Sequence, residues 1–314
     1  MNRLARARFP FVFLWDFESK KPVVFEREKA AENGLFFEME GRGNSPAMPR
    51  PRKNFFFRSQ PMPKADYAAA FAKVQAGLRR GDSYLTNLTF PTPIETNFSL
   101  QELFGASRAR FKVLYRDQFT CFSPEPFVRI TANEIATYPM KGTIDAALPQ
   151  AAERILNDPK EAAEHATIVD LLRNDLSRVA KAVRVRRYRY LEALQTHESR
   201  LLQVSSEVVG TIDTDFWNQL GDHFLTLLPA GSISGAPKVK TCELIRKAEQ
   251  QERGYFTGVF GYYDGKTLQS AVMIRFIEQR NGRLYFRSGG GITANSQCGK
   301  EYEEMIQKVY VPIY

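Results

Sequence analysis

The chain has 314 residues, 43% of them apolar, which is enough to bury a large core in one big domain or in two closely packed halves. Its net charge of +9 is not accompanied by a motif that enters a nucleic-acid groove or binds a single strand. Attraction of a small anionic substrate explains the charge as well as nucleic-acid binding does. We therefore expect no nucleic-acid partner. Its cysteines, Cys121, Cys242 and Cys298, are too widely spaced for a disulfide framework or a metal pattern, which fits reduced thiols in the cytoplasm.

The N-terminal segment predicts a hairpin and a loop. The apolar run Phe9 to Trp15 is too short to span a membrane and no small-residue cleavage site follows it, so we expect no membrane partner. The runs Phe9 to Phe17 and Pro22 to Phe25 predict a β-hairpin. Basic residues interleaved with Gly and Pro then favour a solvated loop: Arg42, Arg50, Arg52, Lys53 and Arg58.

The middle of the chain alternates predicted helices and strands. A helix is expected from Asp66, a natural N-cap, to Arg80, where Gly81 stops it. Strands are expected at Asp82 to Phe90, within residues 111–138, and at residues 183–191 and 203–212. Another helix begins at Asp158 and Pro159, with a continuous buried stripe of Ala162, Ala166, Val169, Leu172, Leu176 and Val179.

The stretch Ala230 to Lys240 is too rich in Gly, Ser and Pro for a helix or strand interior, so it predicts an ordered loop. Gly235 and Pro237 are suited to open the next helix, whose apolar positions are Val239, Cys242, Leu244, Ile245 and Ala248. Backbone amides at such a helix start suit an anion, but a capped helix after a structural turn explains the same residues.

The C-terminal part predicts an antiparallel meander and then a helix. The strands are Tyr255 to Tyr263, Thr267 to Ile277 and Leu284 to Ser288, with tight turns at Asp264-Gly265 and Asn281-Gly282. Alternation along the middle strand places Arg275 on the face opposite Ile274 and Phe276.

Charges gather on one side of the last helix, which is expected from Glu301 to Tyr310. The spacings of 3 and 4 place three charged residues on the same side: Glu301, Glu304 and Lys308. They form either a surface ion-pair cluster or part of a functional site. Just before this helix, Gly289 to Gly291 allow a backbone to approach a ligand closely.

Taken in order, these blocks resemble the chorismate-utilising enzymes, which include anthranilate synthase component I, aminodeoxychorismate synthase component I, and the isochorismate and salicylate synthases. The matching blocks run from about Asp66 to the C-terminus: Gly81 to Leu88, Ser123-Pro-Glu125, Pro139-Met-Lys-Gly-Thr143, Glu164, Asp170 to Asp175, Pro229 to Lys238, Gly289 to Ile292 and Glu301-Tyr-Glu-Glu304. The resemblance implies an α+β fold, an antiparallel β-sandwich core with surrounding helices. It also implies a shortened N-terminal part, residues 1–65, that contributes to the same fold, and a chorismate-binding catalytic domain over residues 66–314.

The expected activity depends on Lys141. Aminodeoxychorismate synthases resemble this chain in carrying Pro-x-Lys-Gly-Thr with the lysine as nucleophile, whereas anthranilate synthases carry alanine there. By this resemblance Lys141 attacks C2 of chorismate as the C4 hydroxyl leaves, and it departs when ammonia adds at C4. Since only a neutral amine is nucleophilic, we expect burial beside cations and a metal to lower the pKa of Lys141. Glu125 matches the family's acid, which protonates the departing hydroxyl.

The resemblance implies a Mg²⁺ cofactor held by Glu164 and Glu304, with Glu301 as a nearby or water-mediated ligand. The groups expected to hold the substrate's carboxylates are Arg275, Lys308 and the amides around Gly289 and Gly291, with Thr143 as an extra hydrogen-bond donor. Because the chain has no glutaminase-like nucleophile motif, ammonia is expected from a separate glutaminase (amidotransferase) subunit.

Three positions depart from the family pattern. Leu85 stands where aminating relatives usually have glutamine and the water-using synthases a lysine base; Gln203 replaces a histidine, and Phe256 a tyrosine near the substrate's side-chain carboxylate. Because leucine cannot activate water, Leu85 argues against the isochorismate and salicylate synthase reactions. The sequence thus predicts amination of chorismate to 4-amino-4-deoxychorismate, on the route to 4-aminobenzoate and folate. The alternatives are the anthranilate synthase reaction, which releases pyruvate, and a catalytically weakened homologue acting as a binding or scaffold subunit.

Overall fold

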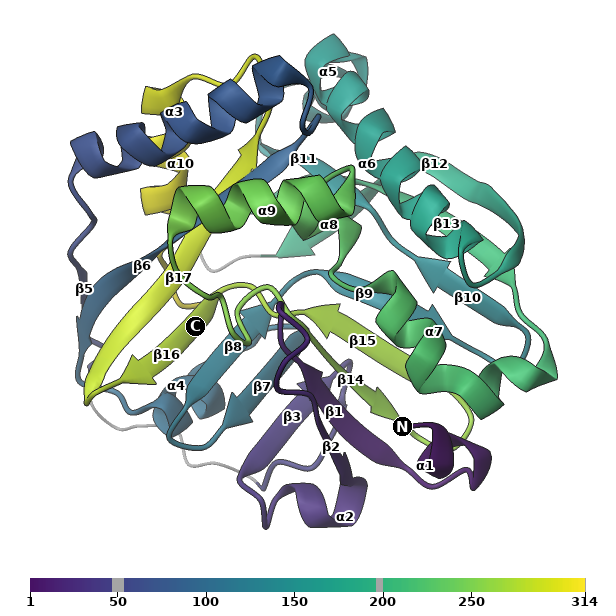
Figure 1. Cartoon of the computed structure of the whole chain (residues 1–314). Helices are drawn as coiled ribbons and strands as arrows, with labels where there is room; N and C mark the ends of the chain where they lie inside the picture. Colours follow the sequence, from purple (N-terminus) through teal and green to yellow (C-terminus); the bar gives the residue numbers. More distant parts are fainter. Residues whose placement is uncertain (47–53, 196–199, 314) are drawn as a thin grey trace.

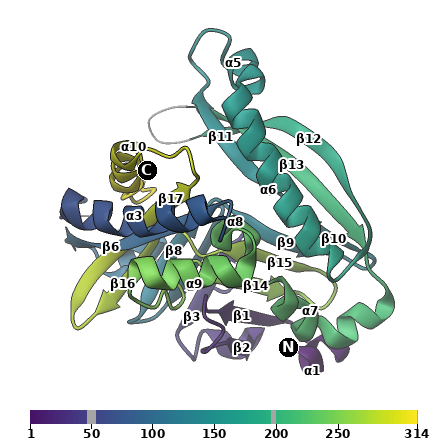
Figure 2. The ribbon, with the colours of Figure 1, turned by 45° about the horizontal axis from the view of Figure 1, so that its top comes forward.

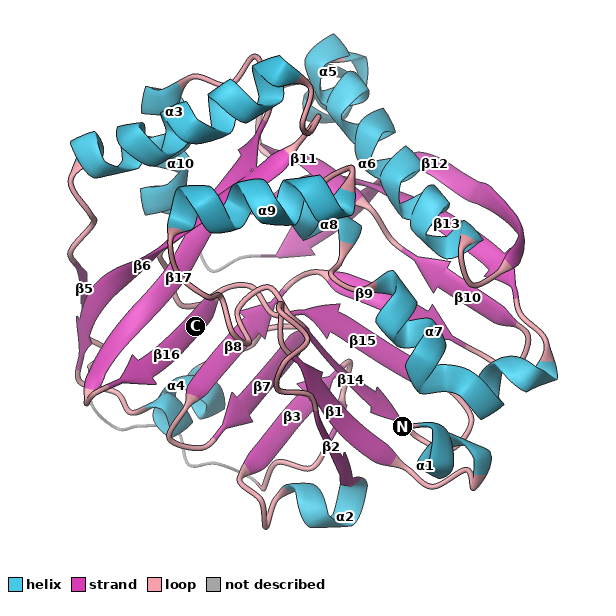
Figure 3. Ribbon diagram, in the orientation of Figure 1, coloured by secondary structure: helices cyan, strands magenta, loops and turns pink. Residues whose placement is uncertain are grey.

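Two antiparallel sheets form the centre of the molecule (Figures 1 and 3). The computed structural model describes residues 1–46, 54–195 and 200–313. Within these residues the first sheet has nine strands, in the order β11 (Met140–Asp145), β13 (Arg200–Thr211), β10 (Glu134–Thr137), β9 (Pro126–Ile130), β15 (Leu268–Val272), β14 (Val259–Tyr263), β1 (Phe11–Trp15) and β2 (Val23–Glu26), with β12 (Lys181–Gln195) paired to β13. The second has eight described strands, in the order β4 (Arg42–Gly43), β3 (Leu35–Met39), β7 (Phe111–Tyr115), β8 (Phe119–Ser123), β16 (Phe276–Arg280), β17 (Arg283–Ile292), β6 (Thr86–Thr96) and β5 (Phe57–Ser59).

The core lies between the sheets because each contributes a buried apolar face. Val12 and Phe260 of the first sheet share one cluster with Val113 and Phe119 of the second, and all are excluded from solvent or nearly so. Burying such faces against each other is the main driving force for this architecture. The α+β fold with an antiparallel sandwich, as expected from the sequence, is confirmed.

Helices cover the outer faces of both sheets, as the turned view in Figure 2 also shows. Helices α3 (Lys64–Arg80), α9 (Lys238–Glu249) and α10 (Cys298–Gln307) pack on β6 and β17, while α5 (Ala151–Asn157) and α6 (Pro159–Ser177) pack on β11 and β13. The shorter elements are α1 (Asn2–Arg6), α2 (Arg27–Ala30), α4 (Leu100–Ala106), η1 (Thr214–Gln219), α7 (Leu220–Leu227) and α8 (Gly231–Ser234). No helix among the described residues is long and apolar enough to cross a membrane.

Several predicted elements are confirmed. The N-terminal hairpin forms as β1 and β2, and Asp158 caps α6 by accepting hydrogen bonds from the amides of Lys160 and Glu161. Gly81 ends α3 in the left-handed conformation with φ 84°, which glycine adopts at low cost. These elements follow from local signals, which is why they were visible in the sequence.

The predicted meander is wrong in one respect that matters for function. The run Thr267 to Ile277 does not form a single strand: β15 ends at Val272 in one sheet, and β16 begins at Phe276 in the other. Arg275, with φ 54°, lies in the segment that crosses between the sheets. Alternation along a strand therefore does not apply to it, and the crossing decides where its side chain lies.

Smaller corrections concern helix starts and exposure. Helix α3 starts at Lys64 after Pro63, so Asp66 is not its cap, and Ala166 of α6 is exposed where His165 is buried. Val239 is 73% exposed, because it lies in the first turn of α9, which begins at Lys238, and points outward. In the basic stretch, Arg42 and Arg58 belong to β4 and β5, whereas Arg50, Arg52 and Lys53 lie outside the described residues.

We predict that Glu249→Ala lowers the free energy of unfolding by about 3–5 kcal/mol, because it leaves the guanidinium of Arg253 buried and unpaired. Glu249 and Arg253 form an ion pair with an N–O distance of 2.6 Å, and their side chains are 0% and 1% exposed. Urea denaturation followed by circular dichroism measures the change.

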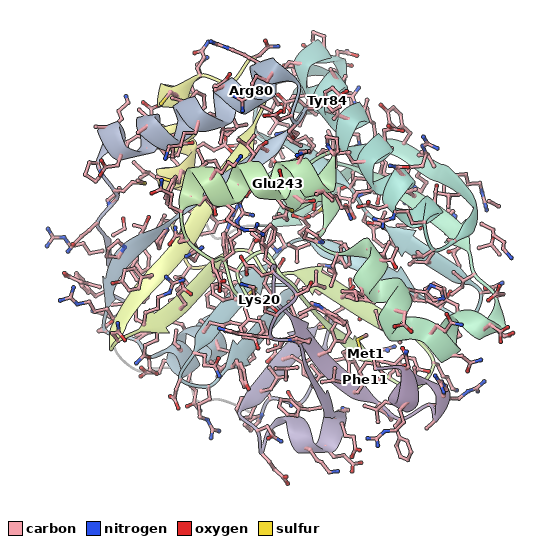
Figure 4. All side chains as sticks on the ribbon, in the orientation of Figure 1. Met1, Phe11, Lys20, Arg80, Tyr84 and Glu243 are labelled. Atoms are coloured by element: carbon pink, nitrogen blue, oxygen red, sulfur yellow. The ribbon has the colours of Figure 1, made fainter. Side chains whose placement is uncertain are left out.

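The matched control is Glu243→Ala on the same helix, where Glu243 is labelled in Figure 4. Its ion pair with Lys240 is largely exposed, so its loss should cost less than about 1 kcal/mol. Equal losses in the two variants would show that the buried pair contributes no more than a surface pair.

Candidate active site

A cavity of about 330 Å³ is lined by strands of both sheets and by the helices next to them. Its size is in the range of pockets that hold small molecules. Its wall comes from β6, β11, β17, α6, α8 and the crossing segment before β16, and Tyr84, labelled in Figure 4 and 74% exposed, lies at its rim. The charged side chains among its described lining residues are Glu125, Lys141, Glu164, Arg275, Arg287 and Lys308.

Lys141 reaches the cavity from an irregular part of β11. The register of β11 against β13 shifts between Met140 and Thr143, and Gly142 adopts φ 90°. Such a bulge re-aims a side chain relative to a regular strand. The amine nitrogen of Lys141 lies 2.9 Å from Oε2 of Glu164 on α6, so strand and helix meet at this ion pair.

The side chains around Lys141 raise its pKa above the ordinary value. Burial acts to lower it, but the hydrogen bond and the attraction of Glu164, together with the charges of Glu304 and Glu161, outweigh burial. The chain's own side chains therefore hold this amine in its protonated form.

Glu125 lies in the turn between β8 and β9 and lines the same cavity. The backbone N–H of Glu125 donates to Ser123 Oγ at 3.0 Å, which orders the turn. Ser232 Oγ, from α8, donates a hydrogen bond of 2.6 Å to Oε1 of Glu125. Burial raises the pKa of Glu125, and the hydrogen bond from Ser232 and the charges of Arg275 and Lys308 offset this only in part. A carboxyl group in these surroundings is suited to carry a proton.

Arg275 has a free donor because of its place between the sheets. Its guanidinium lies 5.2 Å from the centre of the Tyr310 ring, and its Nε has no partner among the described residues. Its carbonyl accepts a hydrogen bond of 3.1 Å from the amide of Phe122 on β8, which fixes the backbone. The arginine is thus positioned at the cavity with one donor that the described residues leave unsatisfied.

The charges at the end of α10 face β17. Lys308 Nζ donates to the carbonyl of Gly289 at 3.0 Å and to Oε1 of Glu304 at 2.5 Å. Burial lowers the pKa of Lys308. Burial also acts to raise the pKa of Glu304, but the charge and the hydrogen bond of Lys308 outweigh burial, so the pKa of Glu304 is lowered. Burial and Glu304 raise the pKa of Glu301.

The carboxylates of Glu164, Glu301 and Glu304 do not form a ready-made metal site. Among the described residues, no group of at least three His, Cys, Asp or Glu side chains is placed to hold an ion. A side chain at Gly290 would lie 3.3 Å from Oε1 of Glu304 and 3.5 Å from Oε2 of Glu301, so these two carboxylates approach the same point of β17. Carboxylate oxygens are the donors that Mg²⁺ prefers, and it commonly needs only one or two of them beside water and substrate. The carboxylates of Glu164, Glu301 and Glu304 are therefore of the chemical type that binds Mg²⁺.

The other sequence-predicted residues are placed differently. Gly289 and Gly291 line the cavity, and a Cβ at Gly289 would lie 2.1 Å from the carbonyl of Leu88, so only glycine lets β6 approach here. Thr143 pairs with Gln203 across β11 and β13, is exposed, and is not among the residues that line the cavity. Glu301 and Glu304 are likewise outside that lining and lie beside Gly290.

Sequence reasoning missed residues that the structure brings to the site. Ser232 lies in the Gly/Ser-rich stretch that suggested a cavity wall, but its hydroxyl could not be paired with Glu125 across 107 positions. The buried ring of His165 lies with Nε2 2.7 Å from Ser206 Oγ and Nδ1 3.4 Å from the carbonyl of Lys141. The only signal for His165 was its position next to Glu164. Arg287 reaches the cavity from β17. The sequence indicated that Arg287 and Phe286 lie on opposite faces of this strand, but not which face borders the cavity.

Comparisons with known proteins identify the family of the chain. The family model described as chorismate binding enzyme matches residues 17–313. An uncharacterised PabA-like protein of Haemophilus influenzae is 51% identical over 99% of this chain and 95% of its own length. Aminodeoxychorismate synthase component 1 of Salmonella typhimurium is 33% identical over 79% of this chain, which spans 57% of that relative. The crystal structure of anthranilate synthase component I from Streptococcus pneumoniae superposes with a TM-score of 0.70 at 25% identity, over 83% of this chain and 60% of that one.

We predict that Glu164→Gln lowers the pKa of Lys141, because it removes the main charge that holds this amine protonated. The rate of acetylation of Lys141 by acetic anhydride, followed by mass spectrometry across pH, should rise at a lower pH than in the unchanged protein. Asp170→Asn is the control, since Asp170 lies on the same helix and pairs with Arg173 at the surface. An unchanged profile for Lys141 in Glu164→Gln would contradict the assignment.

Proposed function

Because this chain belongs to the chorismate-binding enzyme family, we propose that it aminates chorismate to 4-amino-4-deoxychorismate, the reaction of aminodeoxychorismate synthase component I. The observation that supports this reaction most is the placement of Lys141 and Glu125 in one cavity, where β11 supplies an amine and the turn between β8 and β9 supplies an acid. Anthranilate synthases resemble the chain elsewhere but carry alanine in place of the lysine, so Lys141 favours amination over the anthranilate synthase reaction. The product, 4-amino-4-deoxychorismate, would be a precursor of 4-aminobenzoate and folate.

In this proposal Lys141 and Glu125 act on the two ends of one allylic displacement. The neutral amine of Lys141 forms a bond to C2 of the ring, the ring double bonds shift, and the C4 hydroxyl leaves as water with a proton from Glu125. Ammonia then forms a bond at C4 as the bond from C2 to Lys141 breaks. The raised pKa of Glu125 supports its role as the proton donor, because burial keeps part of the carboxyl population protonated.

The remaining charged groups hold the substrate and the ion. We propose that Glu164 and Glu304, with Glu301 nearby, hold Mg²⁺, which when bound offsets the charge of the carboxylates and polarises the substrate as a Lewis acid. Glu164 forms an ion pair with the amine of Lys141. A ligand that draws Glu164 away would therefore release the amine from this pair. Arg275, Lys308 and the amides at Gly289 and Gly291 are proposed to bind substrate carboxylates, with Arg275 offering the geometry of a fork.

Ammonia is proposed to come from a separate glutaminase subunit, and free ammonium should replace it in vitro. Leu85 lies at the cavity wall, and a side chain at Gly291 would lie 3.1 Å from its Cδ1. An apolar side chain here offers no base for activating water, which supports attack by an amine donor over attack by water.

We predict that the pure protein, incubated with chorismate, Mg²⁺ and an ammonium salt at mildly alkaline pH, forms aminodeoxychorismate without pyruvate. Mass spectrometry identifies the product, and a coupled assay measures pyruvate. Lys141→Ala should lower the rate at least about 100-fold because the nucleophile is lost. Lys160→Ala is the matched control: Lys160 also faces Glu164, at 3.8 Å, but its side chain is 78% exposed.

Three outcomes would go against the proposal. Anthranilate with pyruvate would assign the anthranilate synthase reaction, and unchanged turnover in Lys141→Ala would remove the nucleophile. No turnover even with a glutaminase subunit added would favour a catalytically weakened homologue.

We predict that Ser232→Ala shifts the pH dependence of the rate. The hydroxyl of Ser232 donates to the carboxylate of Glu125 and favours its ionised form, so its loss raises the pKa of Glu125 further. Since the acid must be protonated, activity falls as pH rises through this pKa, and the falling alkaline limb should move to higher pH. The control is Ser234→Ala in the same short helix, whose hydroxyl donates to the carbonyl of Ala230. A limb that stays in place or moves to lower pH contradicts the role of Ser232.

A further inference from the structure

Two charged residues to which the reaction proposed above gives no role meet at an ion pair inside the protein. Asp175 lies near the end of α6, and Lys238 is the first residue of α9, directly after the Gly/Ser-rich stretch. Their N–O distance is 2.9 Å, and their side chains are 10% and 16% exposed. A pair so far removed from water costs desolvation energy, so a surface role does not account for it.

The amine of Lys238 is bound by the chain itself. Besides facing Asp175, its Nζ donates a hydrogen bond of 2.7 Å to the carbonyl of Leu227, the last residue of α7. Burial raises the pKa of Asp175 and lowers that of Lys238, while their mutual attraction acts against both shifts. This lysine at the start of α9 therefore joins three helices, α6, α7 and α9.

The short helix α8 lies in the loop that these contacts close. A Cβ on Gly231, its first residue, would lie 2.5 Å from Oδ2 of Asp175, so α8 begins directly against this carboxylate. A helix of a single turn is not stabilised by its own hydrogen bonds. Its position depends on tertiary contacts, which here are the buried side chain of Ile233 and the ion pair.

The same short helix carries the hydroxyl that contacts the proposed acid. Ser232 Oγ donates to Oε1 of Glu125 at 2.6 Å. Besides Ser232, the groups among the described residues that act on the pKa of Glu125 are Arg275 in the crossing segment and Lys308 at the end of α10. Neither member of the ion pair is one of them. An influence of the pair on Glu125 must therefore pass through the position of Ser232.

We propose that Asp175 and Lys238 are positioning residues for the acid Glu125. Their ion pair holds α8 in the place where the hydroxyl of Ser232 reaches the carboxylate. Because this hydrogen bond favours the ionised carboxylate, the pair also sets the pH range over which the acid keeps its proton. The inference rests on the proposed role of Glu125 in amination and adds two residues that act on it from outside the cavity lining.

Two variants that remove opposite charges test the inference: Lys238→Met and Asp175→Asn. In both, the loss of the hydrogen bond from Ser232 raises the pKa of Glu125, so the falling alkaline limb of the amination rate should move to higher pH by about one pH unit. A direct effect of charge would move the limb in opposite directions, since loss of an amine raises the pKa of a carboxyl group and loss of a carboxylate lowers it. Opposite movements would overturn the inference.

The matched controls are Lys240→Met and Asp170→Asn. They lie on the same two helices, and both take part in ion pairs at the surface, with Glu243 and Arg173. Their limbs should stay where the unchanged protein has its limb.

Thermal unfolding separates positioning from a purely structural role. Breaking a buried pair leaves a charge unpaired and lowers stability. The double variant Asp175→Asn/Lys238→Met leaves no such charge, so it should fold and still show the limb at higher pH. A lower melting temperature with the limb in place would assign the pair a structural role only and overturn the inference.

A double-mutant cycle with Ser232→Ala tests the route of the effect. In the Ser232→Ala protein, Asp175→Asn should move the limb little further, because the hydrogen bond is already absent. A second full movement would overturn the inference, while the role of Ser232 and the proposed function stand.

A titration without turnover separates this inference from the proposed reaction. In protein labelled with ¹³C-glutamate, the carboxyl signal of Glu125, assigned with Glu125→Gln, is followed by NMR across pH. If the protein does not aminate chorismate but the midpoint of this signal moves to higher pH in Lys238→Met and Asp175→Asn, the inference stands and only the reaction fails. A midpoint that stays in place overturns the inference, whatever the protein catalyses.

Discussion

The buried ion pair of Glu249 and Arg253 joins the parts of the chain that form one wall of the cavity. Glu249 accepts hydrogen bonds from the backbone and hydroxyl of Thr89, and Arg253 donates to the carbonyl of Asn87, so the end of α9 is attached to β6. Arg253 also begins the segment that carries Phe256 and Thr257 into the cavity and then continues as β14 in the other sheet. Because both charged side chains are buried, small displacements would leave charges unpaired, and the wall is therefore held rigidly.

Charge is distributed unevenly around the cavity. At one end, amines and carboxylates satisfy each other: Lys141 pairs with Glu164, and Lys308 with Glu304. Elsewhere Arg275 and Arg287 keep donors without partners among the described residues. A pocket of this kind favours an anionic ligand, since its cationic side chains attract the ligand and desolvation strengthens the attraction. Chorismate, with its carboxylates at two ends of a small ring system, has the corresponding charges.

The departures from the family pattern lie within this arrangement. Leu85 packs toward Gly291, Gln203 pairs with Thr143 across the strands, and Phe256 lies beneath Arg287. His165 contacts both Ser206 and the carbonyl of Lys141, so a histidine from α6 supports the lysine's backbone even though Gln203 replaces one in β13. At one of the three changed positions, Gln203, a neighbouring element thus supplies another polar side chain.

The sequence by itself determined the elements whose signals are local: the N-terminal hairpin, the cap of α6 at Asp158 and the left-handed end of α3 at Gly81. Its ordered motifs also determined the family and most of the charged residues that line the cavity. Only the tertiary structure decided that the run 267–277 divides between two sheets, that Ser232 meets Glu125, and that Arg287 turns inward with unsatisfied donors. It also placed Glu164 against Lys141, where the carboxylate raises the pKa of the amine. The physical reason is that burial, pairing and desolvation depend on residues far apart in the chain, whereas caps and turns depend on a few neighbours.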